Sequence, residues 1–154
     1  MGHIISALPL GATLYLATKS PTCVLMGCAV AVLVDTDHLL DYLIITKRVD
    51  TPRKIMESYK TLQILHKNYF LFHAWEWAAL LLLLLALFPS LLLASFVAGY
   101  LTHMIIDQIY NTRFLGKFNL KNLFYFFLYR LKYGFDVIRL RQNGPILTTS
   151  ERIY

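Results

Sequence analysis

Hydrophobic and polar residues alternate along the chain in long blocks, and four of these blocks are strongly apolar. They cover residues 4–18, 22–45, 69–88 and 90–110. A bilayer core of about 30 Å needs about 20 helical residues, so the last three blocks are long enough to cross it and the first is marginal. Because backbone groups in lipid must be satisfied within their own segment, we expect helices near residues 4–18, 22–45, 62–88 and 90–112. The predicted fold class is all-α: one integral membrane domain over residues 1–154 with about four transmembrane helices.

The connections between these blocks predict the topology. Lys19 is the only charged residue in the two short turns, which lie at Lys19-Ser20-Pro21 and at Pro89. The other basic residues gather in residues 46–68 and 111–154. The positive-inside rule therefore places both basic stretches and both termini in the cytoplasm. Residues 118–141 mix aromatic residues and Leu with Lys and Arg, which predicts an interfacial amphipathic helix on the cytoplasmic leaflet.

Composition and net charge narrow the class further. The 154 residues are 57% hydrophobic and 16% charged, whereas soluble domains carry about 25% charged residues. The net charge of +6 would suit nucleic acid, but topology alone accounts for it. We therefore expect a membrane lipid as partner and no nucleic acid, and the sequence leaves monomer and homo-oligomer open.

The apolar segments contain no Lys or Arg, yet they hold five of the nine Asp and Glu residues. An intramembrane carboxylate is costly and is functional by default. Protonation or a bond to a neighbouring helix would explain one such residue, but not five together with several histidines. At 1.5 Å per residue the polar groups lie roughly 18–26 Å from the turns, in one layer at the cytoplasmic end. The residues of this layer are His3, Asp35, His73, Glu76, His103 and Asp107.

The spacing of these residues indicates which side chains share a helical face. His103 and Asp107 are four residues apart, and His73 and Glu76 are three apart, so each pair should be neighbours. His66 would stack below His73 if that helix starts near residue 62. The polar residues between 35 and 41 spread over roughly 160° of a helix, which is too wide for one metal ion. One or two of them should therefore serve another purpose.

Imidazoles with carboxylates in one layer are the ligands of a transition-metal site, with Zn²⁺ first and Mn²⁺ or Fe²⁺ as alternatives. One zinc uses three or four ligands, so the larger number here predicts two or three ions. The candidate metal ligands are His3, Asp35, Asp37, His38, His66, His73, His103 and Asp107. Glu76 (base or further ligand) and Asp41 (base, or partner of a histidine) are the candidate catalytic residues. Lys67 and Arg113 flank the ligand helices and are the candidate contacts to a substrate phosphate.

Paired metal ions can stabilise both the attacking and the leaving oxygen of a phosphoester and can generate hydroxide at neutral pH. The sequence has no Gly-rich phosphate loop, no Gly-x-Ser-x-Gly elbow and no HExxH motif. The predicted function is metal-dependent hydrolysis of a phosphoester in a lipid or lipid-linked substrate at the cytoplasmic leaflet, like that of a phospholipase C or a phosphatase. The alternative is a metal-binding or cation-transporting membrane protein without hydrolase activity.

The order of these motifs resembles a known family. An early His is followed by Asp35-Thr36-Asp37-His38, by His66-Lys67 and His73, and by Gly99-Tyr100-Leu101-Thr102-His103 with Asp107. Over residues 3–107 this pattern resembles the YdjM-like membrane-bound, metal-dependent hydrolases, and it is distantly similar to zinc-dependent phospholipase C and S1/P1 nucleases. The resemblance implies an inner-membrane location, phosphoester hydrolysis and a trinuclear type of zinc site. It implies the ligands His3, Asp35, Asp37, His38, His103 and Asp107, and it leaves open the choice between His66 and His73.

Overall fold

The computed structural model is all-helical in the part of the chain that it describes. That part comprises residues 2–61, 67–114, 123–136 and 139–140, without the side chains of residues 2–6, 56–57, 59–61 and 110–114. The helices are α1 (Gly2–Thr18), α2 (Pro21–Leu33), α3 (Thr36–Thr46), α4 (Pro52–Thr61), α5 (Trp75–Leu87), α6 (Leu91–Phe114), η1 (Leu123–Tyr125) and α7 (Phe127–Lys132).

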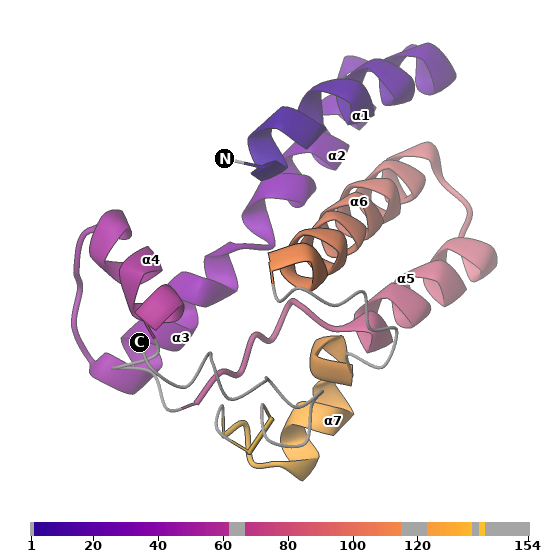
Figure 1. Cartoon of the computed structure of the whole chain (residues 1–154). Coiled ribbons are helices and arrows are strands. Elements are labelled where there is room, and N and C mark those ends of the chain that lie inside the picture. Colours follow the sequence, from indigo (N-terminus) through magenta and orange to yellow (C-terminus); the bar gives the residue numbers. More distant parts are fainter. Residues whose placement is uncertain (1, 62–66, 115–122, 137–138, 141–154) are drawn as a thin grey trace.

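Four apolar helices form the larger body of the molecule. In it α2 packs against α1 and α6, and α5 packs against α6 (Figure 1). The turn after α1 closes tightly because Lys19 adopts a left-handed φ of 52° and the Ser20 hydroxyl accepts a hydrogen bond from the Cys23 N–H. The Ser90 hydroxyl accepts one from the Leu93 N–H at the start of α6. Such capping satisfies backbone donors that a helix start leaves free.

Two helices, α2 and α6, approach each other closely at a glycine pair. A Cβ on Gly99 of α6 would lie 2.3 Å from the carbonyl oxygen of Gly27 on α2. Small residues let helix backbones approach in this way. One turn further along each helix, the His103 ring reaches the Ala31 carbonyl oxygen, with 2.7 Å between Nδ1 and O. The glycine contact therefore sets the depth at which α6 presents His103 beside α2.

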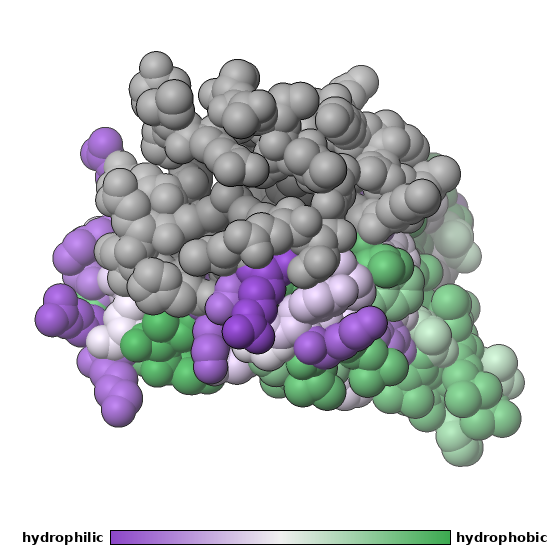
Figure 2. Space-filling view, turned by 60° about the horizontal axis from the view of Figure 1, so that its bottom comes forward, coloured by the Kyte–Doolittle hydropathy of each residue, from purple (hydrophilic) through white to green (hydrophobic). Residues whose placement is uncertain are grey.

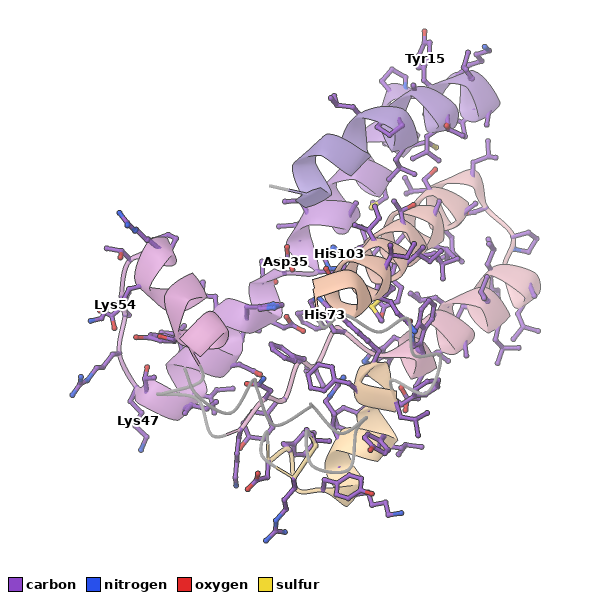
Figure 3. The ribbon with its side chains drawn as sticks, viewed as in Figure 1. Tyr15, Asp35, Lys47, Lys54, His73 and His103 are labelled. Atoms are coloured by element: carbon purple, nitrogen blue, oxygen red, sulfur yellow. The ribbon has the colours of Figure 1, made fainter. Side chains whose placement is uncertain are left out.

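Two helical stretches are long and apolar enough to cross a membrane: Pro21–Thr46, which joins α2 and α3, and Leu91–Ile109 within α6. Ala7–Thr18 and Trp75–Leu87 are shorter apolar helices. Leu82, Leu83 and Leu87 of α5 expose about half of their surface or more. In Figure 2 hydrophobic residues fill the right end of the visible face, and hydrophilic residues lie at its left end and across its middle. Figure 3 shows Lys47 and Lys54 at the α3–α4 end.

Three expected helices differ from the structure. The helix expected over 22–45 is interrupted at Val34 and Asp35, where the Thr36 hydroxyl donates to the Leu33 carbonyl oxygen. Within the described residues 67–88, the helix expected over 62–88 begins at Trp75, because side chains of other elements accept most of the backbone N–H groups of residues 69–74. The single helix expected over 118–141 is absent from the described residues there, which form the short helices η1 and α7.

We predict that Gly99→Ala destabilises the protein by about 1–3 kcal/mol, because the added methyl group meets backbone and forces α2 and α6 apart. Gly11→Ala is the matched control, since its Cβ would approach only side chains, the nearest being the Cys28 Sγ at 3.2 Å. Thermal unfolding in detergent measures the difference. Equal loss in both variants would contradict a special role for the glycine pair.

Candidate metal centre

Four side chains from three parts of the chain converge at one end of the helical body. Asp35 lies at the break between α2 and α3, and His73 precedes α5. His103 and Asp107 lie one turn apart on α6. One ligand atom from each of the four falls within 4.8 Å of the others, and Figure 3 shows Asp35, His73 and His103 close together. The expectation that His103 and Asp107 share a face is confirmed by this grouping.

The distances within this group match the size of a zinc ion. The Nε2 atoms of His73 and His103 are 2.9 Å apart. Asp107 Oδ2 lies 3.2 and 3.9 Å from these two atoms, and Asp35 Oδ1 lies 3.6 Å from each. These five edges average about 3.4 Å, and the centre of a regular tetrahedron of that edge is about 2.1 Å from its corners, the usual Zn–N and Zn–O distance. The oxygens of Asp35 and Asp107 also lie within 4.8 Å of each other, so the four ligand atoms can surround one ion of this size.

Each histidine is oriented by a hydrogen bond on its other ring nitrogen. His103 Nδ1 donates to the Ala31 carbonyl oxygen, and His73 Nδ1 lies 2.8 Å from a carboxylate oxygen of Asp37. A proton on both Nδ1 atoms leaves two Nε2 lone pairs facing each other, which repel unless they share a cation. Partners of this kind fix the tautomer of metal-binding histidines.

Without a metal ion, a proton can take the cation's place on His73. Burial of the ring lowers its pKa, but hydrogen bonds to Asp107, Asp35 and Asp37 outweigh that effect and raise the pKa of His73 to about 11. A metal ion binds the deprotonated nitrogen, so it must displace this proton.

A second group consists of Asp37, His38 and His73. Asp37 is fully buried, and its carboxylate lies 3.0 Å from His38 Nδ1 and accepts the Phe72 N–H at 2.9 Å. A neutral imidazole has one lone pair, so His73 can ligate an ion in only one of the two groups. Its Nδ1 faces Asp37, which leaves Nε2 for the group with His103.

The two candidate catalytic carboxylates bind backbone in the structure. Asp41 is buried and accepts the N–H groups of Tyr69 and Phe70 at 2.7 and 2.9 Å. Glu76 does not share a helical face with His73 as expected, because His73 lies outside the helix. It accepts the N–H groups of Phe127 and Leu128 at the start of α7. Neither belongs to a metal-binding group of the described residues.

The remaining predicted residues lie away from the centre or outside the described part. Lys67 is exposed and forms a backbone bridge with Asp136. Arg113 belongs to the last turn of α6, but its side chain is outside the described part, as is that of His3. His66 lies among residues 62–66, which are also outside it.

Two residues near the centre were missed by sequence reasoning. Arg130 of α7 is fully buried and donates to the carbonyl oxygens of Phe70 and His73. The Tyr100 hydroxyl oxygen lies 2.7 Å from the carbonyl oxygens of Phe72 and Ala74. Tyr100 stands in the Gly-Tyr-Leu-Thr-His motif, which was a usable signal. Arg130 stands among the basic residues of 111–154, all of which the positive-inside rule already explained.

Comparison with known proteins adds no assignment: no family model, curated protein or solved structure matches the chain significantly. The resemblance to YdjM-like hydrolases therefore stays a prediction from the motifs.

We predict that the detergent-purified protein binds one Zn²⁺ or Co²⁺ per chain. His103→Ala removes a ligand, so it should weaken binding by more than the roughly 10- to 100-fold typical for loss of a ligand's hydrogen-bond partner. Equilibrium dialysis with metal analysis measures this, and Asp136→Asn, outside both groups, is the control. Equal uptake by wild type and His103→Ala would refute the centre.

A separate prediction concerns the orientation of His73. Asp37→Asn replaces the carboxylate that accepts from His73 Nδ1 with a weaker acceptor, so Zn²⁺ affinity should fall by about 10- to 100-fold. Competition with a chromophoric chelator gives the affinity. Asp50→Asn is the matched control, because Asp50 pairs with Lys54 at the far end of α3. If the two variants bind alike, Asp37 does not orient the ligand.

Proposed function

We propose that this chain is a membrane-embedded, metal-dependent hydrolase that cleaves a phosphoester of a lipid or lipid-linked substrate at the cytoplasmic leaflet. The observation that carries the proposal is the convergence of Asp35, His73, His103 and Asp107 at tetrahedral distances, at one end of an apolar helical body. In this proposal α1, α2, α5 and α6 cross the bilayer, and the centre holds one ion, zinc in the first place.

The charges support the orientation. Lys47, Arg48, Arg53 and Lys54 are exposed at the α3–α4 end, whereas the turns at the other end carry only Lys19. Basic residues mark the cytoplasmic side of short connections. A centre at that boundary can take a phosphorylated headgroup while the acyl chains remain in the bilayer.

The unequal exposure of the four ligands supports catalysis at the edge of the centre where Asp35 lies. Asp35 exposes 43% of its side chain, whereas the side chains of His73 and His103 are buried. A zinc ion would supply a water of lowered pKa and a Lewis acid for the phosphoryl oxygen. Four protein ligands fill a tetrahedral site, so catalysis needs a fifth position, which zinc can accept. The exposed edge of Asp35 is where water and substrate can reach that position.

The apolar half of the helices argues against transport. Residues 21–33 of α2, 77–87 of α5 and 91–102 of α6 contain no charged side chain. Ions that cross a membrane need polar groups along their path. A metal-binding protein without hydrolase activity is the second candidate, because closed tetrahedral sites are usually structural. The exposed edge of Asp35 supports hydrolysis over this candidate.

We predict that the Zn²⁺-loaded protein, reconstituted in vesicles with phospholipids and a polyprenyl monophosphate, releases phosphate or a phosphorylated headgroup. His103→Ala and Asp107→Ala should lower the rate at least about 100-fold, because the electrostatic stabilisation of the transition state by the ion is lost. Asp136→Asn should keep the wild-type rate. Metal binding without turnover of any substrate would favour the second candidate.

A further inference from the structure

The segment of residues 67–74 carries His73 but has almost no regular structure to hold it. Phe70 within it has a φ of 42°, a left-handed conformation that a non-glycine residue keeps only where its surroundings enforce it. The Phe70 N–H is bound by Asp41, and its carbonyl oxygen is bound by Arg130. The position of the metal ligand therefore depends on side chains from other elements.

Arg130 is the most buried of these side chains. It is 0% exposed, and it donates to the carbonyl oxygens of Phe70 at 2.8 Å, His73 at 2.8 Å and Phe124 at 2.6 Å. Its Nε makes no hydrogen bond within the described part of the chain. Burying a guanidinium without a bonded carboxylate is costly. In return, Arg130 fixes the backbone at Phe70 and at His73, on both sides of residues 71–72.

Glu76 completes a reciprocal connection between α5 and α7. Its carboxylate accepts the N–H groups of Phe127 at 2.9 Å and Leu128 at 3.0 Å. The α7 helix thus holds the chain before and at His73 through Arg130, and the first turn of α5 holds α7 through Glu76. We call Arg130 and Glu76 together the latch. Arg130 binds the backbone at and before His73, and Glu76, which binds α7, lies three residues after His73.

We propose that Arg130 is a positioning residue of the metal centre and that the latch of Arg130 and Glu76 keeps His73 Nε2 in register with His103 Nε2. This inference rests on the proposed function only in so far as the centre binds metal. It gives α7 a specific task, which is to shape the centre without touching the ion. Glu76 then acts through the backbone of α7 and not as the reacting base.

The test is Co²⁺ titration of the detergent-purified full chain, followed by the visible absorption that reports tetrahedral geometry. Arg130→Met should weaken Co²⁺ binding at least tenfold and change the intensity of the bands, because His73 loses its register. Arg130→Lys should recover part of the affinity, since an ammonium group can donate to some of the same carbonyl oxygens but cannot reproduce the planar fork. Lys132→Met, an exposed residue of the same helix, should match wild type.

Glu76→Gln provides an independent variant if Arg130→Met does not fold, because it leaves the buried guanidinium in place. The amide can accept from only one of the two N–H groups, so a several-fold loss of Co²⁺ affinity with an altered spectrum is expected. Wild-type affinity and spectrum in both Arg130→Lys and Glu76→Gln would overturn the latch while leaving the metal centre intact. Failure of the wild-type chain to bind Co²⁺ would instead overturn the centre, and the latch with it.

Discussion

Carboxylates at the end of apolar helices dominate the structure, because an ionised group out of water must find a partner. The chain meets this requirement in two ways. Asp37 and Asp41 of α3 accept backbone N–H groups of residues 69–72. Asp35 and Asp107 face the imidazoles of His73 and His103. The first pair shapes the segment that carries His73, and the second pair surrounds the space that an ion can fill. The need to pair buried carboxylates therefore accounts both for the backbone segment that holds His73 and for the metal centre itself.

The register between α2 and α6 links helix packing to the metal site. Gly27 and Gly99 bring α2 and α6 into backbone contact, and the next turn of each helix brings the Ala31 carbonyl oxygen to His103. A core of Val30, Ala78 and Met104 fills the space beside it. Because packed helices resist small shifts, His103 stays fixed, and accuracy at the centre depends on how firmly His73 is held opposite it.

Much of this was predictable from the sequence, and the failures share one cause. The apolar blocks gave the helices, and the four-residue spacing gave His103 and Asp107 a common face. The same periodic reasoning put His73 on a helix with Glu76, although residues 67–74 are held by Asp41, Asp37 and Arg130. A segment whose backbone is satisfied by distant side chains has no periodic signal. Arg130 was not predicted for the same reason, since its partners Phe70 and His73 lie 60 and 57 residues earlier in the chain.

Charge balance decides how many ions the centre can hold. Asp35 and Asp107 supply two negative charges, and two neutral imidazoles supply none, so one divalent ion makes the group neutral. A second ion would need further carboxylates, but Asp41 and Glu76 are committed to backbone N–H groups, and Asp37 holds His73. An uncompensated divalent charge beside apolar helices is strongly unfavourable. Among the described residues the charge balance therefore favours one ion in this group, whereas the expected two or three ions, which also counted His3, His38 and His66, stay a prediction.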